Sequence, residues 1–397
     1  MLTVEQKAII SQTVPVLEQY GTQITKVFYE TMFNAHPELL NVFNKTNQSQ
    51  GRQQTALAMT VLAAAKHIDN LAALLPQVEQ IGHKHRALQI LPEHYPIVGE
   101  NLLKAIKIVL GDAATPAIID AWAVAYQQIA DIFIGVEQQM YQQASWQGFA
   151  PFRVVEKNIT GSDIAVFSVI PVNGDSQPAI DLDKLNLVAG QYITVKTQPS
   201  GSENTALRHY SIVSIDASQG LQFAVRRDLG NDHEGLVSNY LHDAVQVGDE
   251  ILLSAPAGDF VLASQLITQN TIPLVLISAG VGVTPVKAML EQQLAQNPNR
   301  PIIWVYACQD SAHHAFAEDI EALLAKGLNT QSHTFYSAEG ERLTTAWLEN
   351  LPNPADVYVC GSMNFMEQMI AGLLSLKHHN DSVHYEPFGP KMSLPVV

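Results

Sequence analysis

The sequence contains few cysteines and few basic residues. Its 397 residues include two cysteines, Cys308 and Cys360, which are too few for a disulfide framework and are typical of a reducing compartment. Lysines and arginines number 22 against 38 aspartates and glutamates, and the formal net charge is −16. A strongly acidic chain without a basic cluster disfavours nucleic acid and anionic membranes as partners. We therefore expect a cytoplasmic protein whose partners are small molecules, with no stable membrane association.

The sequence also lacks a long uninterrupted apolar run. Its most apolar stretch, residues 271–290, contains two prolines, two glycines and a lysine, which predict a strand, a loop and a helix in place of a membrane span. The first residues carry no basic segment ahead of an apolar one, so no signal peptide is predicted. Apolar residues make up 47% of the chain and charged residues 15%, which indicates folded domains, and the length predicts two or three of them.

Three sections of the chain differ in their hydrophobic pattern. In residues 3–145 apolar side chains recur at intervals of three and four, with proline and glycine breakers between segments, which predicts an all-α domain. From Trp146 to Phe260 short alternating segments are separated by turn residues, which predicts a small antiparallel β-barrel. The remainder alternates buried strands with helical segments and predicts an α/β domain with a parallel sheet. The predicted strands are residues 152–155, 165–170, 191–195, 210–213, 221–225, 273–278, 301–306 and 356–360, and the predicted helices of the last section are residues 285–296 and 315–326.

One tetrapeptide in the barrel section has the residues of a flavin site. Residues 208–211, Arg-His-Tyr-Ser, resemble the Arg-x-Tyr-Ser signature of flavoproteins of the ferredoxin-reductase type. The Arg208 guanidinium can bind a pyrophosphate with two hydrogen bonds, the Tyr210 ring can stack on an isoalloxazine, and the Ser211 hydroxyl can reach the flavin N5 edge. Such a tetrapeptide also occurs in strands by chance, but Gly248-Asp249 and residues 256–260 follow at the usual distance.

A glycine-rich loop in the last section indicates a nucleotide site. Two glycines, Gly280 and Gly282, follow a buried strand and precede a helix, so the backbone can approach a pyrophosphate and the helix start favours its charge. The spacing is Gly-x-Gly-x-x-Pro, which matches the same reductase class and differs from the dinucleotide Gly-x-Gly-x-x-Gly. A plain tight turn is the alternative. The predicted NAD(P)-binding residues are Gly280, Val281, Gly282, Val283, Thr284 and Pro285.

A histidine in the helical section is placed as a metal ligand would be. Ile81, His85 and Leu88 share one helical face, so the imidazole points into an apolar slot. A neutral imidazole is the usual proximal ligand of haem in globins, although this spacing also fits a core or surface histidine. Tyr95 and Glu137 occur downstream, where they can equally be a packing aromatic and a solvated helix residue. A carboxylate that accepts the second imidazole N–H would make the ligand more basic.

Along essentially its full length the chain resembles the flavohaemoglobins, which join a globin, a flavin barrel and a nicotinamide domain in this order. The resemblance implies an all-α globin domain over residues 1–146, an antiparallel β-barrel FAD-binding domain over 150–262 and an α/β NAD(P)-binding domain over 263–397. It implies haem b, FAD and NAD(P)H as cofactors. His85 would be the axial ligand of the haem iron, with Tyr95 and Glu137 hydrogen-bonded behind it.

The resemblance also assigns the other side of the haem pocket. Tyr29 would donate a hydrogen bond to dioxygen, and Tyr29, Tyr95 and Glu137 would be the catalytic residues. Gln53 would supply a second polar group, Leu57 would wall the pocket and Phe43 would lie against the porphyrin. Residues of each of these types are, taken singly, more often part of a core. A lipid is a further ligand that this pocket would admit.

The flavin site implied by the resemblance extends beyond the tetrapeptide. Lys84 and Glu386 would lie between flavin and haem and tune the redox potential, the alternative being a surface ion pair of little energetic value. Family members usually carry Cys where Pro387 stands, and Phe388 is still expected beside the flavin ring. They commonly have Pro where Ser362 stands, so Cys360, expected near the nicotinamide, can also be a core cysteine. The predicted FAD-binding residues are Tyr192, Arg208, His209, Tyr210, Ser211, Pro387, Phe388, Gly389 and Pro390, with Gly235 and Ser238 at a phosphate.

The predicted hydride donor is NADH. The residues after the second strand of the last section, Cys308 to Ser311, include no arginine that would bind a ribose phosphate. His313 and His314 follow closely and can help to bind a phosphate, which leaves NADPH as the alternative.

The resemblance implies a nitric oxide dioxygenase. NAD(P)H would reduce FAD, FAD would reduce haem, and nitric oxide and dioxygen would be converted to nitrate by a monomeric enzyme. The first alternative is a haem protein that binds or senses oxygen or a lipid and carries a vestigial reductase. The second is a flavin-dependent reductase of other acceptors, such as iron or peroxides.

Overall fold

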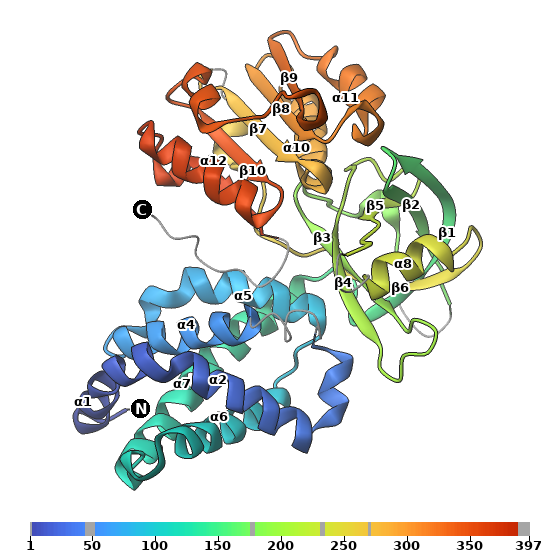
Figure 1. Cartoon of the computed structure of the whole chain (residues 1–397). Coiled ribbons are helices and arrows are strands. Elements are labelled where there is room, and N and C mark those ends of the chain that lie inside the picture. The colour runs from blue at the N-terminus through green and yellow to red at the C-terminus, as the bar shows by residue number, and fades with distance from the viewer. Residues whose placement is uncertain (1, 44–51, 175–178, 231–234, 269–270, 388–397) are drawn as a thin grey trace. The chain divides into compact units, whose positions relative to one another are not determined.

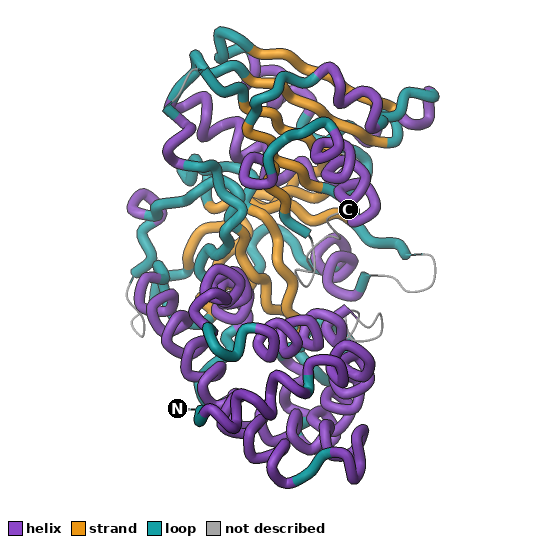
Figure 2. Tube along the Cα trace, turned by 90° about the vertical axis from the view of Figure 1, so that its left-hand side faces the viewer, coloured by secondary structure: helices purple, strands orange, loops and turns teal. Residues whose placement is uncertain are grey.

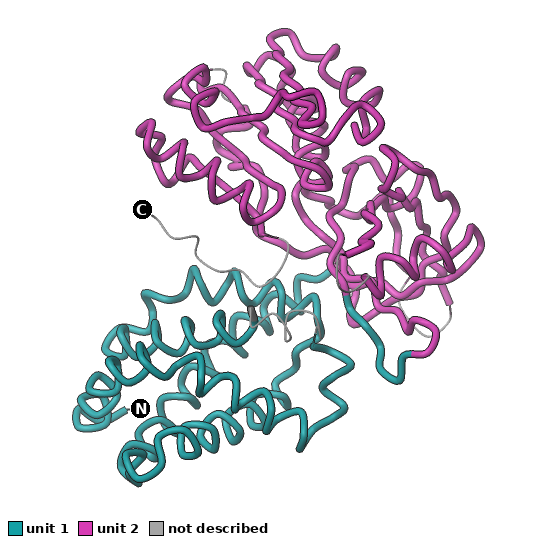
Figure 3. Tube along the Cα trace, in the orientation of Figure 1, with its two compact units in different colours: residues 1–144, 202–207 teal, residues 145–201, 208–397 magenta. Residues whose placement is uncertain are grey.

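The computed structural model describes residues 2–43, 52–174, 179–230, 235–268 and 271–387. The chain divides into two compact units, residues 1–144 with 202–207 and residues 145–201 with 208–397 (Figure 3).

The first unit is helical, as predicted (Figures 1 and 2). Helix α2 packs on α4 and α6, and α5 packs on α7. The core contains Phe28 and Met32 of α2, Leu102 of α6 and Trp122 of α7, none of which is more than 3% exposed. The described helices are α1 (Val4–Gln12), α2 (Val14–Ala35), η1 (Pro37–Asn41), α4 (Arg52–Lys66), η2 (Leu71–Leu74), α5 (Leu75–Leu88), α6 (His94–Leu110), η3 (Gly111–Ala113) and α7 (Pro116–Gln143).

Helix α7 is long and apolar enough to cross a membrane by length and composition alone. Thr115 caps its first turn and Pro116 occupies the first helical position, where a missing N–H leaves no bond unmade. Within the unit, α7 packs against α1, α5 and α6, and it buries Trp122, Phe133 and Glu137. A helix with neighbours on several sides and a buried carboxylate is typical of the core of a helical domain.

The second unit begins with a six-stranded antiparallel sheet of strand order β4-β3-β6-β1-β2-β5. A bridge between Ile212, directly after β4, and Phe223 of β5 connects the two outer strands and closes the sheet into the predicted barrel. The strands are β1 (Phe149–Thr160), β2 (Ile164–Pro171), β3 (Tyr192–Thr197), β4 (Ala206–Ser211), β5 (Leu221–Arg226) and β6 (Glu250–Ser254), and two helices accompany them, η4 (Leu182–Lys184) and α8 (Leu236–Asp243).

The rest of the second unit is an α/β domain with a five-stranded parallel sheet of order β11-β10-β7-β8-β9. Its strands are β7 (Leu274–Ala279), β8 (Ile302–Cys308), β9 (Thr330–Tyr336), β10 (Asp356–Cys360) and β11 (Val383–Tyr385). Its helices are α9 (Ser264–Ile267), η5 (Gly280–Gly282), α10 (Val283–Gln296), η6 (Ser311–His313), α11 (Ala317–Leu324), η7 (Ser337–Glu339), η8 (Thr345–Asn350), α12 (Met363–Ser375) and η9 (Asn380–Ser382).

The parallel sheet is buried on both faces, with α11 and α12 on opposite sides of it (Figure 1). Because side chains alternate along a strand, Leu274 and Leu276 pack with α10 and α11, whereas Val275 and Ile277 pack with α12. This two-sided burial explains why the strand is a continuous apolar run in the sequence.

Helix α10 joins the α/β domain to the barrel. Gln292 Oε1 accepts a hydrogen bond from Ala189 N at 2.9 Å, Glu291 Oε2 accepts one from Ile215 N at 3.2 Å, and Lys287 Nζ donates to the Val213 carbonyl at 3.3 Å. These bonds satisfy buried or half-buried backbone groups of the barrel with side chains of the helix.

A buried charge network connects the segment before β8 with strands β10 and β11 of the parallel sheet. Arg300 and Asp356 are 0% and 1% exposed, and the Arg300 Nη2–Asp356 Oδ2 distance is 3.0 Å. The second carboxylate oxygen lies 3.0 Å from Nε2 of His384, whose ring stacks on Tyr358 at 4.5 Å. Removing one partner of such a pair typically costs about 3–5 kcal/mol, so this network matters for the edge strand β11.

The structure confirms the predicted fold class and changes some element bounds. The strand expected at residues 210–213 lies earlier, at Ala206–Ser211. The helix expected from residue 315 begins at Ala317, because Phe316 has a left-handed backbone with φ of 56°. The domain boundaries implied by the resemblance stay predictions.

Candidate functional sites

The candidate metal site of the first unit is formed by three helices. His85 lies in the last turn of α5, Tyr95 in the first turn of α6 and Glu137 in α7. Oε1 of Glu137 lies 2.7 Å from Nδ1 of His85 and accepts a hydrogen bond from the Tyr95 hydroxyl, also at 2.7 Å. Glu137 is 2% exposed, so this carboxylate interacts in a medium that screens charge poorly.

The hydrogen bonds determine which imidazole nitrogen remains for a metal. Burial and the Glu137 charge raise the pKa of Tyr95 far above its usual value, so its hydroxyl stays protonated and donates. Glu137 then accepts the His85 Nδ1–H as well, and Nε2 is the nitrogen with a lone pair. A neutral imidazole with a carboxylate behind it fits the proximal ligand of haem.

A second group of contacts holds the turn between α5 and α6. The Tyr126 hydroxyl donates to the Tyr95 carbonyl at 2.6 Å, and the Tyr141 hydroxyl donates to the Ile90 carbonyl at 2.7 Å. A Cβ on Gly99 would lie 2.5 Å from the Tyr126 ring, so glycine at this position allows the tyrosine to approach. Sequence analysis missed Tyr126 and Tyr141, because nothing in their local pattern distinguishes them from core aromatics.

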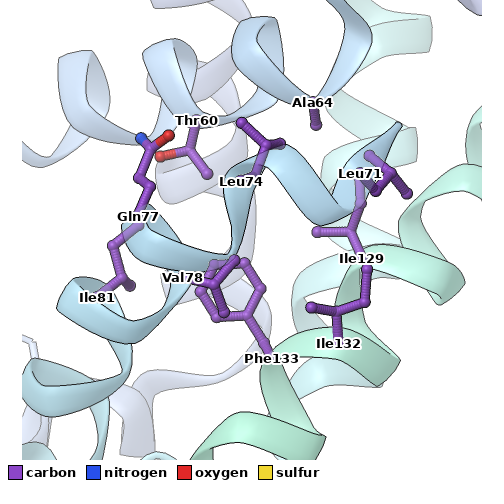
Figure 4. Close-up of a pocket in the computed structure, with 10 residues that line it drawn as sticks. All are labelled: Thr60, Ala64, Leu71, Leu74, Gln77, Val78, Ile81, Ile129, Ile132 and Phe133. Atoms are coloured by element: carbon purple, nitrogen blue, oxygen red, sulfur yellow. The ribbon is translucent and has the colours of Figure 1, made fainter. Parts of the chain in front are cut away.

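A small apolar cavity is lined by residues of α4, η2, α5 and α7 (Figure 4). The Phe133 ring lines it and also lies 5.8 Å from the His85 ring, measured between centroids. Val78, Ile81 and Ile129 contribute further apolar surface, and Thr60 and Gln77 are the polar residues of the lining. The lining suits an apolar group.

The residues assigned to the other side of the haem pocket come from α2, α4 and the segment after η1. Tyr29 is buried, and its ring lies 5.8 Å from Phe33 and 6.0 Å from Phe43. Burial raises the pKa of Tyr29, so the hydroxyl stays protonated, and it makes no hydrogen bond to the part of the chain that the structure describes. A buried donor of this kind fits a polar ligand in the pocket. Gln53 and Leu57 lie on α4, and Leu57 packs against the same core.

The residues assigned to flavin lie at the ends of barrel strands. Tyr210 stacks on Phe223 at 5.8 Å, and burial raises the pKa of the Tyr210 hydroxyl. Arg208 is half-buried, and burial lowers the pKa of its guanidinium. The His209 ring lies 4.8 Å from the Tyr192 ring, and its Nδ1 lies 2.8 Å from Thr194 Oγ1. Arginine, two aromatic rings and the buried Ser211 fit a flavin with its pyrophosphate.

The predicted flavin site also includes a phosphate position at Gly235 and Ser238 and a C-terminal segment, residues 387–390. Gly235 precedes α8, and the Ser238 hydroxyl donates to its carbonyl at 3.1 Å, so a phosphate here would meet backbone N–H groups. Pro387 is buried, whereas Phe388, Gly389 and Pro390 lie outside the described residues. Lys84 is half-buried in the first unit and Glu386 is 8% exposed in the second, so their proposed pairing stays a prediction.

The glycine loop after β7 has the backbone geometry expected of a nucleotide cradle. Gly280 has φ of 53°, and the nearest atom to a Cβ placed there is Arg226 Nη1 at 4.0 Å. A Cβ on Gly282 would lie 2.3 Å from the Cys360 carbonyl oxygen. An open backbone turn at the start of the 14-residue helix α10, with a guanidinium beside it, fits a pyrophosphate. Arg226 was missed, because only the folded structure brings it to the loop.

Other side chains predicted in the cradle face the core. Val283 is 0% exposed, Pro285 is buried, and the Thr284 hydroxyl donates to the Val281 carbonyl at 2.9 Å. Any contact from these residues to a nucleotide would be made by backbone. Cys360 is fully buried, and burial raises the pKa of its thiol, as expected of the core-cysteine alternative.

The family comparisons divide the chain into the same three sections. The globin family matches residues 26–133, the oxidoreductase FAD-binding domain matches residues 151–262, and the oxidoreductase NAD-binding domain matches residues 276–371. This order confirms the predicted succession of domain types.

Individual proteins are similar over the full length. The flavohemoprotein of Bacillus subtilis is 44% identical over 97% of both chains, and that of Deinococcus radiodurans is 42% identical over 100% of both. The crystal structure of a flavohemoglobin from Malassezia yamatoensis with bound FAD and heme is 26% identical, with a TM-score of 0.85 over 98% of this chain and 100% of that one. The FAD/NAD-binding domain of a nitric oxide dioxygenase from Vibrio cholerae is 33% identical, with a TM-score of 0.52 over 61% of this chain and 99% of that one. The chain belongs to the flavohemoprotein family.

Proposed function

We propose that this oxidoreductase is a nitric oxide dioxygenase that uses haem, FAD and a reduced nicotinamide dinucleotide. The reductase part is similar to that of the Vibrio cholerae nitric oxide dioxygenase, and full-length similarity to flavohemoproteins supports the same activity here. The observation that carries the proposal is the buried contact of 2.7 Å between Glu137 and His85 Nδ1.

The three groups supply the redox chemistry. When bound, FAD would supply hydride acceptance and single-electron release, and haem would supply the redox-active iron for the conversion of nitric oxide and dioxygen to nitrate. The chain contributes binding, orientation and electrostatics to this chemistry.

The proximal residues favour oxygen chemistry over reversible oxygen storage. Glu137 draws the Nδ1 proton of His85 toward itself and increases electron donation from Nε2. Tyr95 donates to the same Glu137 oxygen and fixes the carboxylate. A strongly donating histidine would favour activation of dioxygen at a bound haem, and a protein that only stores dioxygen would gain little from it.

The other assigned residues bind and orient the reactants. Tyr29, protonated and buried, donates a hydrogen bond to a diatomic ligand, and Gln53 offers a second polar group on α4. In the second unit Arg208 binds the flavin pyrophosphate, Tyr210 and Tyr192 pack beside the ring system, and the Gly280 loop holds the nicotinamide pyrophosphate.

The proposal is tested by nitric oxide consumption in aerobic buffer with a reduced nicotinamide dinucleotide. We expect rapid consumption with nitrate as the product. Slow consumption, or a product other than nitrate, would contradict a dioxygenase. His85→Ala distinguishes the dioxygenase from a flavin-dependent reductase of other acceptors. In that variant, nitric oxide consumption should be lost, whereas reduction of ferricyanide by the flavin should persist.

The proposal includes the setting of the enzyme. Both cysteines are free thiols, which supports a cytoplasmic location. The net charge of −16 supports the absence of nucleic acid partners and of stable membrane association. We propose a monomer, with dioxygen, nitric oxide and the nicotinamide dinucleotide as its partners. We also propose a lipid as an additional ligand of the haem pocket, although the small cavity near Phe133 does not itself have room for a lipid chain.

A further inference from the structure

The end of strand β8 lies beside the glycine loop. Ala279 of β7 is level with Ala307 of β8, so the Gly280 turn and the segment from Gln309 leave the sheet at the same edge. A dinucleotide across such an edge has its pyrophosphate at the glycine loop, and an acidic residue after the next strand meets the adenosine ribose. The nicotinamide is expected on the other side of β7, where β10 ends at Cys360. Asp310 therefore stands on the adenosine side.

The turn that carries Asp310 is held in one conformation. Asp310 Oδ1 accepts a hydrogen bond from His313 N at 3.1 Å and lies 2.6 Å from His313 Nδ1. Barrel residues support the same turn, because Phe316 N donates to Thr160 Oγ1 at 2.7 Å and a Cβ on Gly161 would lie 3.3 Å from the His313 carbonyl. The Asp310 carboxylate is thus oriented before a ligand arrives, and a carboxylate has about four lone-pair positions, so it can accept further hydrogen bonds beside those from His313.

The loop after β9 brings further negative charge to this edge. Ala338 N donates to the Gln309 carbonyl at 2.8 Å, which ties the loop after β9 to the segment after β8. Glu339 lies in the turn directly after Tyr336, and Glu341 N donates to the Tyr336 carbonyl at 3.1 Å. Burial, Cys308, Glu339 and Glu341 raise the pKa of Tyr336. The Tyr336 hydroxyl in turn lies 2.9 Å from His314 Nδ1.

The two histidines of this turn, His313 and His314, do not neutralise the negative charge of this edge. Burial lowers the pKa of His314, so its imidazole is neutral at pH 7. The hydrogen bond from His313 lowers the pKa of Asp310, so the aspartate is ionised. Nδ1 of His313 is occupied by Asp310. The edge therefore combines three carboxylates with imidazoles that are neutral or already paired.

We propose that Asp310 accepts hydrogen bonds from the adenosine ribose hydroxyls of the hydride donor, and that Asp310, Glu339 and Glu341 together exclude a ribose 2′-phosphate. The consequence is selectivity for NADH over NADPH. An ionised carboxylate is a good acceptor for a ribose hydroxyl, whereas a phosphate beside like charges is repelled. The inference rests on the proposed function only in that a reduced nicotinamide dinucleotide is the hydride donor. It does not depend on whether nitric oxide is the substrate that the enzyme oxidises.

The first test measures flavin reduction in the full-length protein with haem and FAD bound. Under anaerobic conditions, NADH and NADPH are mixed with wild type and with Asp310→Asn in a stopped-flow instrument. In the variant we expect weaker apparent NADH affinity, an unchanged limiting rate, and a preference for NADH reduced about tenfold, as for loss of one charged contact. The matched control is Glu367→Gln, an exposed acid on α12, which should keep the wild-type preference.

The second test measures binding without hydride transfer. Calorimetry with 5′-ADP and 2′,5′-ADP compares wild type with a Glu339→Gln, Glu341→Gln double variant that leaves the Asp310 turn intact. We expect tighter binding of 2′,5′-ADP in the variant and unchanged binding of 5′-ADP. The inference is overturned if Asp310→Asn keeps the wild-type preference for NADH over NADPH and the double variant keeps the wild-type ratio of affinities for 5′-ADP and 2′,5′-ADP. If neither dinucleotide reduces the flavin, the proposed function fails, and the calorimetry still decides the role of the carboxylates.

Discussion

The helical unit and the reductase unit form their sites from different parts of the chain. In the helical unit, side chains of His85, Tyr95 and Glu137 come from three helices and meet at distances of 2.7 to 3.3 Å. In the reductase unit, the nucleotide cradle is backbone, opened by Gly280 and closely packed at Gly282. Function at the first site should therefore be impaired when a side-chain functional group is removed. Function at the second should be impaired when a methyl group is added to a glycine.

The largest effect is expected from His85→Ala. Without the imidazole, the helical unit should lose haem, while the flavin stays because its residues belong to the other unit. The absorption spectrum of the purified protein measures both, since the Soret band should vanish and the flavin bands remain. His67→Ala, which removes an exposed histidine at the end of α4, should leave both intact. A full Soret band in His85→Ala would identify another axial ligand.

The second effect tests the backbone site. In Gly282→Ala the new Cβ would lie 2.3 Å from the Cys360 carbonyl oxygen. Overpacking of this kind costs about 1–3 kcal/mol, so flavin reduction by NADH should slow by up to roughly a hundredfold. The matched control is Gly135→Ala in α7, where, apart from the helix's own nearby backbone, no atom of the described residues lies within 4 Å of the added carbon. Alanine there should stabilise the helix by about 0.5–1 kcal/mol. Normal flavin reduction in Gly282→Ala would show that the cradle adapts.

The third effect isolates the charge behind the histidine. Glu137→Gln keeps the shape of the side chain but removes its charge, so His85 becomes a weaker electron donor. Nitric oxide turnover should fall by about tenfold to a hundredfold, the range seen when partners of metal ligands are removed. The iron–histidine stretching frequency in resonance Raman spectra should fall as well. Glu79→Gln, at an exposed position of α5, serves as the control. An unchanged frequency would mean that Glu137 does not influence the ligand.

The smallest effect concerns one neutral hydrogen bond. Tyr29→Phe preserves the ring contacts with Phe33 and Phe43 and removes the buried hydroxyl. Loss of a neutral hydrogen bond of about 1 kcal/mol should speed oxygen dissociation roughly fivefold. Stopped-flow displacement of dioxygen measures the rate, and Tyr20→Phe, at a position 37% exposed, should not change it. Identical rates for both variants would remove Tyr29 from the list of ligand contacts.

The predictability of the fold follows from burial. Strands β7, β8 and β10 were predicted because burial on both faces makes them continuous apolar runs. Strand β9 was missed, because it lies at the sheet edge, is partly exposed and consists mostly of polar residues. Strand β11 has three residues, too few for a periodic signal.

The predictability of the sites follows from how local their signals are. The Gly280 loop can be read from sequence, because strand, glycine spacing and helix are consecutive. The grouping of His85, Tyr95 and Glu137 came from family resemblance, since no local spacing specifies a contact across three helices. The place of Arg226 beside the loop, and that of the Asp310 turn at the same sheet edge, follow only from the folded sheets.

The hydrogen bonds from α10 to the barrel have a consequence for protein engineering. Gln292, Glu291 and Lys287 complete backbone bonding of a neighbouring domain, so a fragment that starts at residue 263 would expose polar groups without their acceptors and donors. Calorimetric melting of the reductase half should accordingly be a single cooperative event. A chimera that borrows the nicotinamide portion from a relative would need to carry the barrel segments 188–191 and 213–216 along with the helix.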